Sequence, residues 1–253
     1  MIRNVAGSYR RALAETVWHF GGWRPSDETV DALKGEGLWN NDWEAALELL
    51  RRHGSTPLPA FSELVEVFSG FYFGGDPHGD PGAWQGFIGS EPILVGPDFF
   101  RTLSRQRIAW GFVSGAEPPS ARFVLESRLA LRSPPLIAMG DAPDKPDPTG
   151  LLRLAGQLLG TPPGPGAPPV AYLGDTVADV QTVVRARERV PGQALVSLAV
   201  APPHLHSPGR EPARRAYEAR LLAAGADHLL ASTDSLTPEL LLGWLSAPWR
   251  PRS

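Results

Sequence analysis

The chain has no cysteine among its 253 residues, which excludes disulfides, thiolate metal sites and a thiol nucleophile. It also has little excess charge, because a formal net charge of -3 offers no electrostatic reason to expect nucleic acid or an anionic membrane surface as a partner. No apolar run approaches the roughly 18 residues that span a bilayer, and no basic-then-apolar signal pattern opens the sequence. These absences predict a cytoplasmic protein.

Lysine is scarce as well. Of the 24 basic residues only Lys34 and Lys145 are lysine, so a general surface cation is usually arginine here. A lysine that remains suggests a need for its compact ammonium, which binds phosphate or carboxylate as a point charge. The hydrophobic share of 42% and charged share of 20% fit a globular protein with one large domain or two smaller ones.

Two different patterns divide the chain. In the first hundred residues, apolar positions at helical spacing and capping residues predict an almost entirely helical region, with helices over residues 8–19, 26–34, 42–50, 61–71 and 97–106. From Ile108 onward, short apolar runs alternate with helical stretches. The predicted strands are 108–113, 136–139, 170–173, 194–200 and 228–231, and the predicted helices are 119–130, 149–159, 177–190, 212–224 and 238–245. Such alternation predicts a doubly wound α/β fold with a parallel sheet.

Polar groups follow three of these strands. Ser114 follows the first strand, Lys145 lies in the loop after the second, and Asp175 and Asp179 follow the third. Parallel strands bring their carboxyl ends to one edge, where ligands of open α/β sheets bind. A hydroxyl that donates to a phosphate oxygen, an ammonium that neutralises its charge and two acids that hold Mg²⁺ together suit a phosphoryl group.

Each group also has a structural interpretation. Ser114 suits a turn, Lys145 a solvated loop, Asp175 a helix cap and Asp179 a solvent-facing position. Their order along one edge of the sheet favours the functional interpretation.

These residues carry a resemblance to a known family. Ser114, Lys145-Pro146-Asp147-Pro148 and Gly174-Asp175-Thr-Val-Ala-Asp179 resemble, in order and context, the second, third and fourth motifs of the haloacid dehalogenase (HAD) superfamily. The spacing is similar to that of its phosphatase-rich subfamily I, which has a helical cap between the first and second motifs. The resemblance implies a Rossmann-like core over residues 101–253, an all-helical cap over 8–100 and a remnant of the core over 1–7.

The resemblance also implies an activity. The family pattern indicates a Mg²⁺-dependent phosphatase that acts on a small phosphorylated metabolite through an aspartyl-phosphate, with Ser114 and Lys145 in catalysis and Asp175 and Asp179 as metal ligands. A homodimer is one assembly that such a protein can form.

The family's first motif, Asp-x-Asp-Gly, is absent. No Asp precedes Asp27, and the resemblance places Met1 to Val5 just after that motif, with the nucleophile about four residues upstream. Either the start of the reading frame is misplaced, or the protein is a non-catalytic HAD-like binding protein for a phosphate or metabolite. Omitting the motif's central strand would leave two unpaired inner edges and a groove in the core, which favours the misplaced start. The chain as written is predicted to be inactive.

The predicted cap supplies candidates for substrate binding. Asn40, Asn41, Lys34 and Arg10 are the polar residues expected to face the site. The alternative is that Asp42 caps the helix that follows and that Arg10 is an ordinary surface residue. A third functional class is a nucleotide-binding transferase, but the sequence contains no Gly-rich phosphate loop that would support it.

Overall fold

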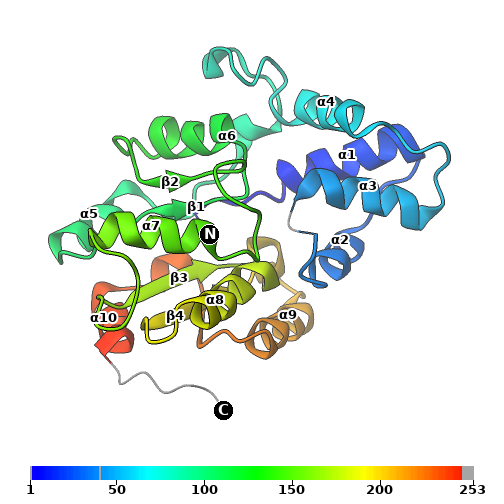
Figure 1. Ribbon diagram of the computed structural model, residues 1–253. Coiled ribbons are helices and arrows are strands. Elements are labelled where there is room, and N and C mark those ends of the chain that lie inside the picture. Colours follow the sequence, from blue (N-terminus) through cyan, green and yellow to red (C-terminus); the bar gives the residue numbers. More distant parts are fainter. Residues whose placement is uncertain (1, 40, 247–253) are drawn as a thin grey trace.

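The computed structural model describes residues 2–39 and 41–246, and places a bundle of helices beside an α/β unit (Figure 1). The bundle consists of α1 (Tyr9–Gly21), α2 (Asp27–Lys34), α3 (Asp42–His53) and α4 (Phe61–Tyr72). These helices share one apolar core that contains Leu13, Leu50 and Phe68. The predicted helical region is therefore present, with ends that differ from the prediction by a few residues.

The connection from the bundle to the α/β unit contains short helical turns, η1 (Pro81–Ala83) and η2 (Phe87–Ser90), followed by α5 (Pro97–Arg105). Side chains of α5 pack with strand residues of the α/β unit and not with the bundle. Residues 2–4 run beside this connection, because Arg3 and Ile93 form an antiparallel bridge and Leu94 donates to the carbonyl of Ile2 at 2.9 Å. The division into domains at residue 100 stays a prediction.

The α/β unit alternates as the sequence predicts, and every strand pair in it is parallel. The strands are β1 (Phe112–Val113), β2 (Leu136–Ile137), β3 (Val170–Gly174), β4 (Leu195–Val200) and β5 (His228–Leu230). The helical elements are α6 (Pro118–Arg122), the π-helical turn η3 (Phe123–Arg128), α7 (Thr149–Leu159), α8 (Val177–Arg189), η4 (Pro203–His206), α9 (Glu211–Ala223), η5 (Thr233–Ser235) and α10 (Pro238–Ser246). The single helix predicted over 119–130 is thus an α-helix that widens into a π-helical turn.

The sheet is in two pieces. One piece pairs β1 with β2 and the other has the order β3-β4-β5, and within residues 2–39 and 41–246 no ladder joins β1 to β3. In Figure 1 the β1–β2 piece lies above α7 and the β3–β4 piece below it. The strands predicted over 108–113 and 136–139 are shorter than expected, and within the described residues β1 and β2 are hydrogen-bonded only to each other.

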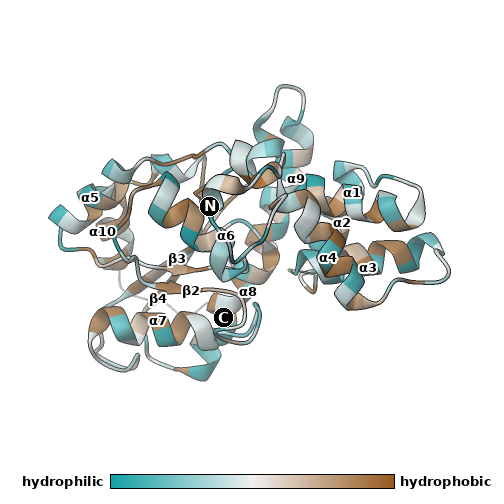
Figure 2. Cartoon of the chain, turned by 90° about the horizontal axis from the view of Figure 1, so that it is seen from above, coloured by the Kyte–Doolittle hydropathy of each residue, from teal (hydrophilic) through white to brown (hydrophobic). Residues whose placement is uncertain are grey.

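Apolar and polar residues are separated around most helices, as Figure 2 shows by the brown and teal faces of the ribbon. Burial of the apolar faces against one another holds the two layers of helices to the sheet. In the described part of the chain, no helix combines the length and the apolar character required to cross a membrane.

Candidate functional site

A cavity of about 860 Å³ lies between the two pieces of the sheet and extends to the helical bundle. Its wall includes residues that follow three parallel strands and residues of the bundle. Six of the residues predicted for the site line this one cavity: Ser114, Lys145, Asp175, Asp179, Arg10 and Lys34.

Asp179 organises the turn between β3 and α8. One of its oxygens, Oδ1, lies 2.6 Å from Nζ of Lys145, while Oδ2 accepts from the backbone N–H groups of Asp175 and Thr176 at 3.1 Å each. The Thr176 hydroxyl donates to Oδ2 at 2.8 Å and accepts from the Asp179 N–H at 3.1 Å, which completes a capping box at the start of α8. A Cβ at Gly174 would lie 2.4 Å from Cγ of Asp179, so this turn requires glycine.

The ion pair fixes the charge of both partners. Burial alone would raise the pKa of Asp179, but the charge of Lys145 and the hydrogen bonds to it hold that pKa at about 2. Burial alone would lower the pKa of Lys145, and the Asp179 carboxylate instead raises it well above its usual value. Lys145 is therefore a fixed ammonium in the cavity wall.

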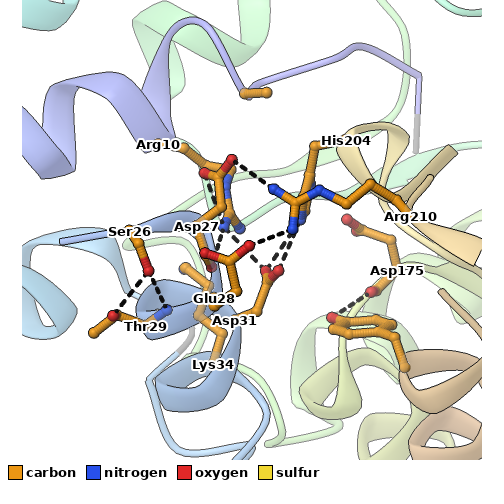
Figure 3. A network of polar contacts seen from close by, with 12 residues as sticks. Arg10, Ser26, Asp27, Glu28, Thr29, Asp31, Lys34, Asp175, His204 and Arg210 are labelled. Atoms are coloured by element: carbon orange, nitrogen blue, oxygen red, sulfur yellow. Dashed lines mark hydrogen bonds and ion pairs between the residues drawn. The ribbon is translucent and has the colours of Figure 1, made fainter. Parts of the chain in front are cut away.

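The carboxylate of Asp175 differs from that of Asp179 because it has no partner among the described residues. In the part of the chain that the structure describes, no hydrogen bond or ion pair reaches its carboxylate, although its backbone carbonyl accepts from the Tyr217 hydroxyl at 3.0 Å (Figure 3). Burial, and then the negative charge of Asp179, raise the pKa of Asp175 to about 6. A half-buried carboxylate without a partner, facing a cavity, is a group available for a ligand.

The geometry of Ser114 is compatible with both of the roles considered from the sequence. Its Oγ accepts from the N–H of Ala116 at 3.0 Å, as in a turn after a strand. Among the described residues no acceptor takes the proton of this hydroxyl, so it can still donate into the cavity.

The cap residues are already paired. Lys34 lies 2.7 Å from Oδ1 of Asp42, and Arg10 lies 3.0 Å from Oδ1 of Asp31. Oδ1 of Asn41 accepts from the N–H groups of Trp43 and Glu44, so Asn41 is the cap of α3 and the expectation that Asp42 caps it is wrong.

The two predicted substrate-binding asparagines are not among the described residues that line the cavity, one because it lies elsewhere and the other because it is not described. Asn41 is absent from the cavity wall, and its engaged oxygen gives no support to the predicted contact with substrate. Asn40 lies outside the described residues.

A polar network joins α2 to the α/β unit (Figure 3). Nε2 of His204 lies 3.0 Å from Oδ2 of Asp31, and Arg210 pairs with Glu28 and lies 3.9 Å from Asp27. Burial would raise the pKa of Asp31, but the hydrogen bond from His204 and the charge of Arg10 lower it on balance.

No local sequence pattern marks the pair of His204 and Asp31, because the two residues lie 173 positions apart in the chain. This network holds α2 over the cavity that contains Asp175.

The residues present suit Mg²⁺ through one protein carboxylate. No group of three or more His, Asp or Glu side chains within the described ranges is arranged around a common point. Mg²⁺ usually keeps several waters and binds through one or two carboxylates plus substrate oxygens. Asp175 has the free oxygens for this, whereas Asp179 would first have to leave Lys145.

No protein-family model matches the chain, and no curated protein matches it. Solved structures, in contrast, are similar to the chain over nearly its whole length. The chain is similar to a phosphonoacetaldehyde hydrolase-like protein from Oleispira antarctica, with a TM-score of 0.66 and 15% identity over 98% of this chain and 90% of that one.

A HAD hydrolase of family IA, variant 3, from Entamoeba histolytica gives a TM-score of 0.58 and 12% identity over 96% of this chain and 94% of that one. At this identity the likeness establishes the fold. The predicted Rossmann-like HAD fold with a helical cap is confirmed.

Proposed function

We propose that this chain is the greater part of a Mg²⁺-dependent HAD-type hydrolase that removes a phosphoryl group from a small metabolite in the cytoplasm. The observation that carries the proposal is the unpartnered carboxylate of Asp175 beside the fixed ammonium of Lys145, in one cavity with the Ser114 hydroxyl. The fold, shared with HAD hydrolases, supports the same chemistry.

Each charged or polar side chain of the site would have a different role in phosphoryl transfer. The Lys145 ammonium, held in place by Asp179, neutralises one phosphoryl oxygen, and the Ser114 hydroxyl donates to another. Asp175 would hold Mg²⁺, which when bound withdraws charge from the phosphoryl oxygens. In this arrangement Asp179 positions Lys145 and the β3–α8 turn, and its role as a direct metal ligand would require a different partner for Lys145.

The nucleophile must be a further carboxylate. In the HAD pattern an Asp oxygen attacks phosphorus, the bond from phosphorus to the leaving oxygen breaks, and water then releases phosphate from the aspartyl ester. The cap acids at the cavity, Asp31 and Asp42, are each paired with a cation. We therefore place the nucleophile in residues encoded upstream of Met1.

The bundle would complete the site. Helix α2 carries Asp31 and Lys34, which line the same cavity as Asp175, and Arg10 lies 3.0 Å from Asp31. A leaving group held between α2 and the β3–α8 turn would be shielded from water during transfer.

The test is an extended chain that includes about a dozen residues encoded in frame before Met1, enough for a strand and a turn. With Mg²⁺ and a panel of sugar phosphates, nucleotides and phosphorylated acids, the extended chain should release phosphate and the 253-residue chain should not. Asp175→Asn should remove the activity, and Asp98→Asn, at an exposed carboxylate of α5, should keep it. A folded extended chain that is inactive on the whole panel contradicts the proposal.

A second candidate is a non-catalytic phosphate-binding or metabolite-binding protein. Ser114, Lys145 and Asp175 share one cavity, and among the described residues that line it every other carboxylate is paired with a cation, which favours this candidate. Upstream codons without Asp-x-Asp, together with calorimetric binding of inorganic phosphate and Mg²⁺ that Lys145→Met abolishes, would select this candidate over the hydrolase.

A further inference from the structure

The contact between α2 and the α/β unit is built from charged and polar side chains (Figure 3). On α2, Asp27 and Glu28 lie four and three positions before Asp31, which is the spacing of neighbours on a helix surface. On the other side lie His204 of η4 and Arg210, the residue before α9. Arg210 pairs with Glu28 and lies 3.9 Å from Asp27. The buried apolar residues of α2 belong to the core of the bundle, so charge has a large part in holding α2 to the α/β unit.

His204 holds Asp31 from the side of the α/β unit. Its Nε2 lies 3.1 Å from Oδ1 and 3.0 Å from Oδ2 of Asp31, and the imidazole is only 8% exposed. Arg10 of α1 contacts the same carboxylate from within the bundle, 3.0 Å from Oδ1. Asp31 is thus shared between a cation of the bundle and an imidazole of the α/β unit. The charge of that imidazole acts directly on the contact.

The acids and arginines of the contact are charged at neutral pH. Hydrogen bonds from Arg210 lower the pKa of Glu28 to about 2. Burial would raise the pKa of Asp31, but His204 and Arg10 lower it on balance. With a neutral imidazole, the three carboxylates of α2 therefore face two guanidiniums. A proton on His204 supplies the third positive charge.

Protonation of His204 should strengthen the contact with Asp31. An imidazole gains a proton between about pH 5 and pH 8, and in either state one of its nitrogens can donate to a carboxylate. Charge on both partners shortens and strengthens a hydrogen bond, and salt screens a buried pair much less than an exposed one. The contact should therefore be firmer at pH 6 than at pH 8.

Other titratable or charged groups lie near the contact. His206, also in η4, is exposed, and its Nε2 lies 3.0 Å from a backbone carbonyl of the same loop. Burial raises the pKa of Asp175, on the β3–α8 turn, to about 6, and burial keeps the Tyr217 hydroxyl of α9 neutral by raising its pKa. Arg220 of α9 lies against Gly35 at the end of α2. Of these groups, His206 and Asp175 can change charge in the same pH range as His204, so the experiment has to separate them from it.

The contact forms part of the cavity wall. Asp31 of α2 lines the cavity, and so do Pro202, Pro203 and His204. Separation of α2 from η4 would therefore open the wall of the cavity that contains Asp175.

We propose that His204 is a pH-dependent latch between the helical bundle and the α/β unit. Protonated His204 holds α2 on η4 and keeps the cavity wall closed at that point, and neutral His204 lets α2 separate more often. The proposal concerns the position of the bundle alone, and it can be tested whether or not the chain is a hydrolase.

The test is hydrogen–deuterium exchange of the 253-residue chain at pH 6 and pH 8, without ligand. After correction for the intrinsic pH dependence of exchange, amides of residues 27–34 should exchange about fivefold more slowly at pH 6, the effect of about one net hydrogen bond. Amides of α3, which belongs to the bundle but not to the contact, should show no such difference.

Matched variants assign the response to one imidazole. His204→Gln retains a donor toward Asp31 but cannot titrate, so α2 should exchange at both pH values as it does in the wild type at pH 8. His206→Gln, the same change in the same turn, should keep the wild-type response, and so should Asp175→Asn. If His204→Gln does not fold, Asp31→Asn gives a second test, because it removes the carboxylate with which the imidazolium pairs.

Movement of the whole bundle can be measured separately, because the chain has no cysteine of its own. Fluorophores attached through Glu63→Cys in α4 and Ala219→Cys in α9, both at exposed positions, report the distance between the bundle and the α/β unit. The efficiency of energy transfer should fall from pH 6 to pH 8. With His204→Gln added to the labelled protein, the efficiency should stay constant.

A response that is lost in His204→Gln and Asp31→Asn, and kept in His206→Gln and Asp175→Asn, supports the latch. The proposal is overturned if α2 of the folded wild type shows no response to pH, if His204→Gln retains the response, or if either control variant removes it. A response of α2 exchange at constant transfer efficiency also overturns it, because that result would show fraying of one helix in place of movement of the bundle.

Discussion

Asp175 and Asp179 are separated by three residues and have opposite environments. Asp179 accepts hydrogen bonds on both oxygens and pairs with Lys145, whereas the Asp175 carboxylate has no partner in the described part of the structure. One carboxylate therefore stabilises the fold and the other destabilises it, and an unfavourable charge retained at a cavity is typical of a functional position.

Asp175→Asn should stabilise the metal-free protein. The pKa of Asp175 is about 6 in the folded chain and about 3.9 when unfolded, so its charge opposes folding above pH 6 and this penalty disappears as the pH falls toward 4. We expect the variant to gain roughly 1–3 kcal/mol at pH 8 and nothing at pH 4. Urea unfolding at a series of pH values measures this, with Asp98→Asn as the exposed control.

The response to Mg²⁺ distinguishes the same two proteins in a second way. A ligand that binds only the folded state raises its unfolding free energy, so Mg²⁺ should raise the melting temperature of the wild type and not that of Asp175→Asn. Equal stability of the two proteins at pH 8 would contradict the unpaired state of Asp175.

Lys145→Met should lower the free energy of unfolding, in contrast to Asp175→Asn. It leaves the buried Asp179 carboxylate, with a side chain 5% exposed, without its cation. Removing one partner of a buried pair costs about 3–5 kcal/mol. The pKa of Asp179, now about 2, should rise, so the loss is largest above about pH 4 and shrinks as the pH falls toward 2.

Denaturant unfolding of Lys145→Met at pH 7 and pH 3 measures this pH-dependent loss of unfolding free energy. The double variant Lys145→Met/Asp179→Asn should recover part of the lost free energy. Arg24→Met, at an exposed partner of Glu15, should change the unfolding free energy by less than about 1 kcal/mol.

At the scale of elements, α2 is attached to two parts of the molecule. Val30 and Leu33 are buried in the core of the bundle, while Asp31 reaches across to His204 of η4. Polar contacts of this kind are replaced by water more readily than apolar packing, so the α2–η4 contact is where the bundle can separate from the α/β unit.

Asp31→Asn should loosen that contact, because it removes the charge that faces both Arg10 and His204. Amides of residues 27–34 should exchange several-fold faster, and those of α3 should not change. The matched control is Glu15→Gln, which breaks an ion pair with Arg24 inside the bundle and should leave α2 unaffected. Unchanged exchange in α2 would show that apolar packing alone holds it.

Element boundaries were predictable where local signals are strong. Helix α7 begins and ends where predicted, and Gly160 follows it in the left-handed conformation at φ 66°. The larger errors fall at β1, β2 and α6, whose ends depend on neighbours distant in sequence, such as the edge of β1 that is unpaired within the described residues.

At the scale of the whole molecule, the cavity between β1 and β3 should weaken the centre of the sheet. In the 253-residue chain we expect amides of residues 112–113 and 170–174 to exchange faster than those of 195–200, although central strands are usually the slowest to open. Hydrogen–deuterium exchange resolved by peptide gives this comparison directly, with β5 as an edge-strand reference. Protection of β3 equal to that of β4 would show that the cavity is closed in solution.

The sequence by itself determined the kinds of elements, their order, the parallel α/β class and the polar residues at the ends of three strands, because periodicity and turn chemistry act over a few residues. The tertiary structure alone decided that Asp179 binds Lys145, that Asp175 stays unpaired, that Asn41 caps a helix and that His204 meets Asp31. Those outcomes depend on which side chains become neighbours across tens to hundreds of residues, and in a close-packed fold that choice is made by the packing of whole elements and not by local sequence.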